Sequence, residues 1–195
     1  MSGRKIDIAW ICHEVAGGEN MEVRLIAGGL RQRGFEVAVV PARFRSDTVR
    51  AIREAVRLRP AVLAFHIQYP ASSLLELSLA RCARDIGYAG FIVCAGPMVT
   101  LQPDWVLERV PAVDGCVRFD ATLPLAELIR ALRRGGPLHR VPALVTRERS
   151  SPLRAMPGSV CWRRGPTATS CACPSPRPTW PSCSAPPSAS SARAG

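Results

Sequence analysis

The sequence lacks an apolar run long enough to cross a membrane, and no secretory signal precedes its first apolar segment. No two of its eight cysteines stand in the Cys-x-x-Cys spacing that is typical of zinc sites. Motifs with paired carboxylates, or with a nucleophile beside a base, are also missing. These absences predict a soluble, cytoplasmic protein without a membrane partner, which binds a ligand and does not use its own side chains for catalysis.

The formal net charge of +11 would be typical of a protein that binds nucleic acid. The charge is uneven, however, because the residues after Glu148 include six Arg and no Asp, Glu or Lys. The rest of the chain has 20 basic and 15 acidic residues, and its arginines stand in stretches with helical periodicity that aromatic residues do not interleave. We therefore interpret the charge as solvated helix faces and expect no nucleic-acid partner.

Short apolar segments alternate with amphipathic ones along the first three-quarters of the chain. Strands are expected at residues 6–11, 35–40, 61–66, 91–94 and 113–117, with a short edge strand at 141–146. Helices are expected at 20–33, from 46 or 47 to 58, from 72 or 73 to 86, at 103–109, and at 123–134, the last capped by Asp120. This alternation predicts a doubly wound α/β fold, Rossmann-like or flavodoxin-like. Its five- to six-stranded, mainly parallel sheet should carry helices on both faces.

Ligands of doubly wound folds bind at the carboxyl ends of the strands. That rule points to four loops, at residues 12–18, 66–70, 95–100 and 118–122. In the first loop, His13 can ligate a metal or simply bond to solvent or backbone. Gly17, which precedes the first helix, lets a polar group approach the helix start, although the spacing is not that of a dinucleotide fingerprint.

The second and third loops hold further candidates for ligand contact. His66, Gln68 and Tyr69 place three hydrogen-bonding side chains at one strand end, which is more than a turn needs. The glycine of Gly96-Pro97 leaves room for a large, flat ligand against the sheet edge, or forms an ordinary tight turn.

The tail from residue 148 to 195 is a different kind of sequence. It is rich in Pro, Ser, Ala, Arg and Cys and contains no Ile, Phe, Tyr, Asn, Lys, Gln or His. It has no periodicity and cannot bury a core, so we place the domain at residues 1–147. Three interpretations of the tail are open: a disordered extension, a metal site at Cys171 and Cys173, or translation of a GC-rich gene out of frame.

Several motifs follow one another in an order that is found in a known family. They are Ala64-Phe65-His66-Ile67-Gln68-Tyr69-Pro70, Ala95-Gly96-Pro97, Gln102-Pro103-Asp104, residues 113–122 and 125–132, and Val141-Pro142-Ala143-Leu144. In this respect the chain resembles the cobalamin-binding domain that precedes the catalytic domain of cobalamin-dependent radical SAM enzymes.

The resemblance implies a cobalamin-binding module of a methyltransferase-like radical SAM enzyme, truncated and not catalytic alone. A [4Fe–4S] cluster and S-adenosylmethionine are expected only in a full-length relative, with the radical SAM catalytic domain as a partner. The corrin would lie across the strand ends. The cofactor-binding residues that follow from the resemblance and the loops are Cys12, His13, Gly17, His66, Gln68, Tyr69, Gly96, Pro97, Met98 and Phe119.

The chain also departs from the family's pattern. Ala95 replaces the first glycine of a Gly-Gly-Pro turn, and residues 119–122 replace an acidic run. The Asp-x-His-x-x-Gly motif of classical cobalamin carriers is missing. So is the Cys-x-x-x-Cys-x-x-Cys motif that would hold the iron–sulfur cluster, and the odd tail begins about where it should stand.

Two other functions are consistent with parts of the sequence. The segment from Gly17-Gly18 through Leu30 to Val39-Val40 resembles the opening of the amino-terminal half of a sugar-nucleotide-dependent glycosyltransferase. A phosphorelay receiver would need a cluster of acidic residues at the end of the first strand, where Glu14 stands alone.

Overall fold

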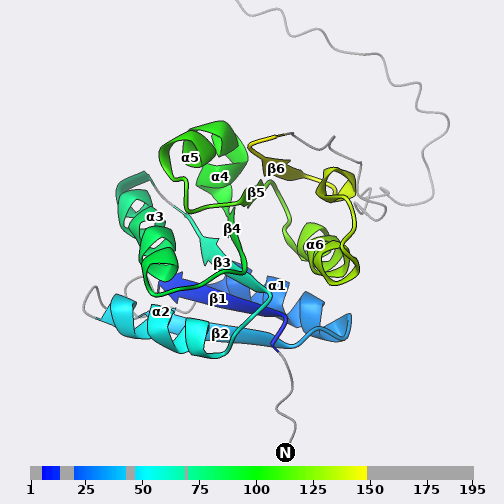
Figure 1. Cartoon of the computed structure of the whole chain (residues 1–195), viewed down its shortest axis with the longest axis horizontal. Helices are drawn as coiled ribbons and strands as arrows, with labels where there is room; N and C mark the ends of the chain where they lie inside the picture. Colours follow the sequence, from blue (N-terminus) through cyan, green and yellow to red (C-terminus); the bar gives the residue numbers. More distant parts are fainter. Residues whose placement is uncertain (1–5, 14–19, 43–46, 69, 149–195) are drawn as a thin grey trace, which may run out of the picture. The chain divides into compact units, whose positions relative to one another are not determined.

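The structure is a computed structural model that describes residues 6–13, 20–42, 47–68 and 70–148, and the side chains of all of these except residues 13 and 70–76. Within these residues six strands form one sheet in the order β2-β1-β3-β4-β5-β6 (Figure 1). The strands are β1 (Ile8–His13), β2 (Val37–Ala42), β3 (Val62–His66), β4 (Phe91–Ala95), β5 (Gly115–Val117) and β6 (Leu144–Thr146). The first five are parallel, and β6 runs antiparallel to β5.

Helices cover both faces of this sheet (Figure 1). They are α1 (Met21–Gln32), α2 (Thr48–Arg57), α3 (Pro70–Asp85), α4 (Pro97–Leu101), α5 (Pro103–Arg109) and α6 (Thr122–Arg134), followed by a 3-10 turn at Leu138–Arg140. One apolar core lies between the sheet and α1 with α6, and a second lies between the sheet and α2, α3, α4 and α5. The prediction of a doubly wound sheet with helices on both faces is confirmed.

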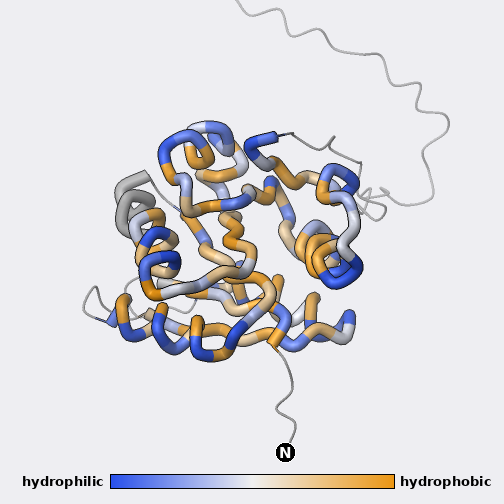
Figure 2. Tube along the Cα trace, viewed as in Figure 1, coloured by the Kyte–Doolittle hydropathy of each residue, from blue (hydrophilic) through white to orange (hydrophobic). Residues whose placement is uncertain are grey.

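Burial on both faces explains why the strands are continuous apolar runs. All five residues of β3 are buried, and the side chains of β1 alternate between the two cores. Figure 2 shows the same contrast, with mainly apolar strands and helices that alternate between polar and apolar faces. No helix in the described part of the chain has the length and apolar character that a membrane crossing requires.

The main differences from the predicted elements have local causes. β1 and β2 lie two residues further along the chain than expected, because the carboxylate of Asp7 accepts the amide hydrogen of Glu36 and occupies the start of this strand pair. The sequence does not predict α4, which has five residues and is too short to show an apolar period. Asp120 accepts the amide hydrogen of Thr122 at 2.9 Å but does not cap α6 as predicted, because the helix begins at Thr122 and its N-cap is Ala121.

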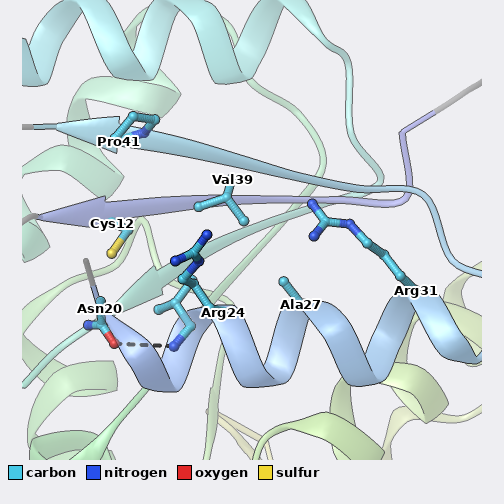
Figure 3. Close-up of a pocket in the computed structure, with 8 residues that line it drawn as sticks. Cys12, Asn20, Arg24, Ala27, Arg31, Val39 and Pro41 are labelled. Carbon is cyan, nitrogen blue, oxygen red and sulfur yellow. Dashed lines mark hydrogen bonds between the residues drawn. The ribbon is translucent and has the colours of Figure 1, made fainter.

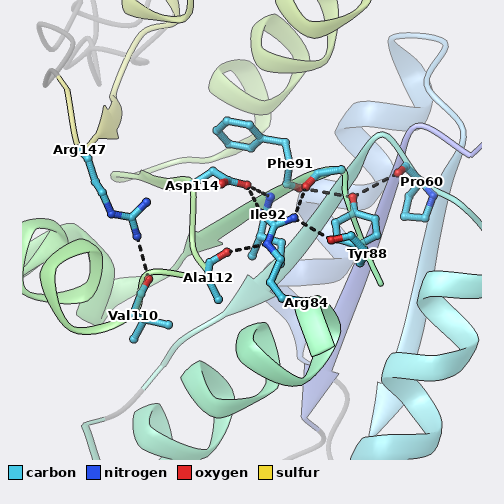
Figure 4. A network of polar contacts seen from close by, with 10 residues as sticks. Pro60, Arg84, Tyr88, Phe91, Ile92, Val110, Ala112, Asp114 and Arg147 are labelled. Atoms are coloured by element: carbon cyan, nitrogen blue, oxygen red, sulfur yellow. Dashed lines mark hydrogen bonds and ion pairs between the residues drawn. The ribbon is translucent and has the colours of Figure 1, made fainter. Parts of the chain in front are cut away.

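At the amino ends of β4 and β5, Arg84 of α3 joins several backbone segments (Figure 4). Its guanidinium donates to the carbonyl oxygens of Tyr88, Gly90 and Ala112. It also pairs with the carboxylate of Asp114, which accepts the amide hydrogen of Ile92 at 2.7 Å. A single cation therefore fixes the end of α3 against the starts of two strands.

Replacing Arg84 by Ala should lower the free energy of unfolding by about 2 kcal/mol, because three carbonyl oxygens and a carboxylate lose a charged donor. Urea denaturation of the purified chain measures the change. Arg53→Ala, on the exposed side of α2, is the control and should alter stability by less than about 0.5 kcal/mol. Equal effects of the two substitutions would contradict the role given to Arg84.

Two cysteines lie side by side in the core. Cys94 of β4 and Cys116 of β5 are partners in adjacent strands, and both are fully buried. None of the four cysteines among the described residues is in a disulfide. The pKa of the Cys116 thiol is raised to about 12, mainly because the thiol is buried. The charge of Asp104 also raises this pKa, and the charge of Arg147 lowers it. This thiol stays protonated at neutral pH and does not act as a nucleophile.

Iodoacetamide at pH 8 should therefore leave Cys116 unmodified in the folded protein, since the reactive thiolate is absent several pH units below the raised pKa. Peptide mass spectrometry after a timed reaction measures the labelled fraction. In guanidinium chloride the same cysteine should react readily. Labelling of Cys116 at equal rates in the folded and unfolded chain would show that the thiol is accessible and that its pKa is not raised.

Candidate functional site

The carboxyl ends of the five parallel strands meet at one edge of the sheet. The connection from β1 leads to α1 on one face, and the connection from β3 leads to α3 on the other. The topological switch point, where doubly wound folds bind their ligands, therefore lies between β1 and β3. The segments that follow β3, β4 and β5 begin at Ile67, Gly96 and Arg118.

A pocket of about 320 Å³ opens at this edge, and we name it the carboxyl-edge pocket. It is lined by Glu22, Gly96, Pro97, Thr100, Leu101 and Phe119. The side chains of Leu101 and Phe119 are exposed, at 81% and 54% of their surface. Large apolar side chains that remain in solvent around a depression are typical of a binding surface.

Gly96 shapes the floor of the pocket. Its φ of +114° is open to glycine and strained for other residues. A Cβ atom at this position would lie 2.5 Å from the carbonyl oxygen of Ile67. The absence of a side chain at Gly96 thus makes room for the backbone of Ile67. That it also makes room for a flat ligand stays a prediction. Pro97 then provides the first residue of α4, which carries Thr100 and Leu101.

Thr100 connects α4 to the loop that follows β5. Its hydroxyl accepts the amide hydrogen of Phe119 at 2.8 Å, and its carbonyl accepts a hydrogen bond from Arg118 at 3.3 Å. Phe119 has a φ of +61°, which is unusual for an aromatic residue and is held by this contact. The guanidinium of Arg118 lies 5.2 Å from the Phe119 ring centre. These contacts keep an apolar ring at the pocket wall.

His66 ends β3 beside the pocket, with only 1% of its side chain exposed. Its Nδ1 accepts a hydrogen bond from the amide of Asn20 at 2.9 Å, and its Nε2 donates to the carboxylate of Glu22 at 2.9 Å. Asn20 also caps α1, because its side-chain oxygen accepts the amide hydrogen of Val23. Both ring nitrogens of His66 are thus engaged within the chain.

The structure brings together some of the predicted site residues and separates others. Gly96, Pro97 and Phe119 line the carboxyl-edge pocket, and His66 contacts it through Glu22. Met98 turns inward and packs against the core on the α4 and α5 side. Gln68 is half-buried, and none of the pockets described here includes it. Gly17, Tyr69 and the side chain of His13 lie outside the described residues.

Cys12 lines a different depression, a groove of about 310 Å³ between α1 and the edge strand β2 (Figure 3). The side chains of Val23, Ala27 and Val39 form its apolar part. Arg31 bridges it by donating to the carbonyl oxygen of Val37 at 2.9 Å. Because side chains alternate along a strand, Cys12 faces the α1 layer and does not share a pocket with Gly96.

Among the described residues, no three His, Cys, Asp or Glu side chains gather in a group that could hold a metal ion. The metal-ligand role predicted for His13 stays a prediction, since its side chain is outside the description. The sequence did not single out Glu22, Thr100 or Leu101 as site residues, although the predicted ligand loop at residues 95–100 ends at Thr100. Two local features could have indicated them. Glu22 stands in the first turn of α1, and a proline starts α4, which carries Thr100 and Leu101.

Comparison with known proteins identifies the family. The family model of the B12 binding domain matches residues 16–129, more than half of the 195-residue chain. The chain belongs to the B12-binding domain family. The match spans α1 to β5 and includes all six residues that line the carboxyl-edge pocket. The predicted resemblance to a cobalamin-binding domain is confirmed.

Two kinds of relative agree with this assignment. An uncharacterized methyltransferase, PH0819, of Pyrococcus horikoshii is 32% identical over 71 residues, which are 36% of this chain and 16% of that protein. The chain superimposes on the cobalamin-bound radical S-adenosylmethionine methyltransferase TsrM of Kitasatospora setae with a TM-score of 0.66 and 17% identity. That match covers 77% of this B12-binding chain and 29% of TsrM.

A further structural match is OxsB, a cobalamin-dependent S-adenosylmethionine radical enzyme. Its TM-score is 0.64 at 13% identity, over 77% of this chain and 23% of OxsB. At such identities the two structures show a shared fold. The B12-binding chain thus spans less than a third of each of these relatives. The glycosyltransferase alternative is not supported, because the B12-binding match includes the segment on which it rested.

Replacing Gly96 by Ala should lower the free energy of unfolding by at least about 2 kcal/mol, since the new Cβ meets the Ile67 carbonyl at a strained φ. Gly28→Ala is the matched control. Gly28 lies in α1 with no atom within 4 Å of an added Cβ, so Ala should leave stability unchanged or raise it. Urea unfolding of both variants measures the difference, and an unchanged midpoint for Gly96→Ala would contradict this account.

Proposed function

We propose that this chain binds cobalamin with the corrin ring at the carboxyl-edge pocket. The observation that carries the proposal is the position of that pocket in a B12-binding domain. It lies at the sheet edge where doubly wound folds take their ligands, and it is walled by the exposed side chains of Leu101 and Phe119.

The chemistry of the lining fits this cofactor. A corrin is a flat, largely apolar ring whose rim carries amide groups. Gly96, Pro97, Leu101 and Phe119 offer apolar surface, while Glu22 offers a polar group at the margin. A depression of about 320 Å³ receives one part of so large a ring. The lining therefore suits a ligand with an apolar face and a hydrogen-bonding rim.

His66 does not serve as a cobalt ligand in this proposal. Its Nδ1 is occupied by Asn20 and its Nε2 by Glu22, so neither nitrogen is available to a metal in this arrangement. A ligand from the chain, if the cobalt takes one, would come from His13.

We further propose that the chain is the cobalamin module of a larger radical SAM methyltransferase of the cytoplasm. The names of PH0819 and TsrM support a methyltransferase, and the small share of each that the chain covers supports a further catalytic domain. That domain would hold the [4Fe–4S] cluster and S-adenosylmethionine and would begin after residue 147. Of the three interpretations of the tail, translation out of frame fits this position best.

Bound cobalamin would supply a cobalt centre that carries a methyl group. The chain's own residues hold and orient the ring. Leu101 and Phe119 exclude water from the part of the ring that they cover, and Thr100 keeps Phe119 in place through its hydroxyl. Glu22 is held by His66, and the Thr100 hydroxyl by the Phe119 amide, so in this proposal the described pocket residues bind and position the cofactor.

Titration of the full chain with hydroxocobalamin should shift the absorbance of the corrin and give a saturable binding curve. Phe119→Ala should weaken the affinity about tenfold, because it removes apolar contact area from the pocket wall. Leu58→Ala is the control: Leu58 is 39% exposed at the far end of α2, and its loss should not change the affinity. Absence of saturable binding by the unmodified chain would overturn the proposed function.

A further inference from the structure

Glu22 is the one charged side chain that lines the carboxyl-edge pocket as described. It stands in the first turn of α1, and 44% of its side chain is exposed. The rest of the lining is apolar or neutral, so this carboxylate is the lining group that can form a charged contact with a polar group of a ligand.

A partly buried chain of hydrogen bonds fixes the orientation of that carboxylate. The side-chain oxygen of Asn20 is committed to the amide hydrogen of Val23 at 3.2 Å, so its NH₂ group faces His66. His66 Nδ1 therefore accepts, and in the neutral imidazole Nε2 carries the proton. That proton is donated to Glu22 Oε2 over 2.9 Å. The cap of α1 thus sets the tautomer of a buried histidine, which in turn holds Glu22.

A carboxylate accepts hydrogen bonds and donates none, and its two oxygens offer about four acceptor sites. His66 uses one of them, on Oε2. The remaining acceptor sites can take hydrogen bonds from N–H donors, whereas the negative charge repels other anions. The primary amides on the rim of a corrin are such donors.

We infer that Glu22 is a specificity-determining residue that accepts an N–H group from an amide on the corrin rim and disfavours corrinoids with carboxylates there. His66 is its positioning residue. This inference rests on the proposed function. A carboxylate in the first turn of α1 would also stabilise the helix dipole, but that role does not require a buried imidazole behind it.

Two nucleotide-free corrinoids test the inference in the full chain: dicyanocobinamide, whose rim carries amides, and dicyanocobyrinic acid, whose rim carries carboxylates. The ratio of their dissociation constants is measured by absorbance or calorimetry. Glu22→Gln should reduce the preference for the amide rim about tenfold, because a neutral amide replaces the charged acceptor. Glu127→Gln on α6, matched at 43% exposure and paired with Arg130, should leave the ratio unchanged.

His66→Gln supplies a second variant, and circular dichroism checks that both variants fold. It should reduce the preference in the same direction and by less than Glu22→Gln, since the carboxylate remains but loses its fixed orientation. In the unmodified chain, the ¹⁵N chemical shifts of His66 should show that Nε2 carries the proton. These shifts should change when dicyanocobinamide binds.

The outcomes separate this inference from the proposed function. If the unmodified chain binds dicyanocobinamide and Glu22→Gln keeps the full preference, the role of Glu22 is overturned while cobalamin binding stands. An equal loss of preference in Glu127→Gln would also overturn it, because the effect would then be one of net charge. If the unmodified chain binds neither corrinoid, the inference and the proposed function fail together.

Discussion

The close approach of Gly96 to the backbone of Ile67 determines the geometry of the carboxyl edge. The amide of Ile67 donates to the carbonyl oxygen of Ala95 at 2.8 Å, which continues the β3–β4 pairing beyond the end of β3. Gly96 can then turn the chain at a φ of +114° and start α4 directly. Because α4 carries Thr100, this turn also fixes the loop of Phe119 and hence the pocket wall.

The two edges of the sheet use their carboxylates differently. At the amino edge, Asp7 and Asp114 accept backbone amide hydrogens of neighbouring segments and pair with Arg133 and Arg84. Those groups stabilise the strand starts, and Asp114 also lines a pocket at that edge. At the carboxyl edge, Glu22 is tied to a buried histidine but stays half exposed in a pocket. Carboxylates thus stabilise the fold at the amino edge, and we propose that Glu22 takes part in binding at the carboxyl edge.

Much of this arrangement follows from the sequence. Apolar runs that alternate with amphipathic segments predict the parallel sheet, and the rule for doubly wound folds selects the loops of Gly96 and Phe119. The direction of single side chains is harder to predict. Cys12 and Met98 fall within the predicted ligand loops. In the structure Cys12 lies in β1 and faces the α1 layer, and Met98 lies in α4 and packs against the core.

The contact between His66 and Glu22 joins residues 44 positions apart and leaves no local pattern that a sequence could display. It depends on the register of β3 against β1 and on the point at which Asn20 starts α1. Similarly, the five residues of α4 are too few for a helical period, although Pro97 marks their start. The location of the pocket is therefore predictable from the sequence, whereas its polar contacts depend on the tertiary structure.

The central claim is that the cofactor binds at the carboxyl edge, between the start of α4 and the loop after β5. Hydrogen–deuterium exchange of the full chain, with and without hydroxocobalamin, tests this claim most directly. We predict slower exchange at residues 96–101 and 118–122 and unchanged exchange at residues 86–91, at the amino edge of the sheet. Protection confined to residues 86–91, with none at 96–101, would contradict the claim.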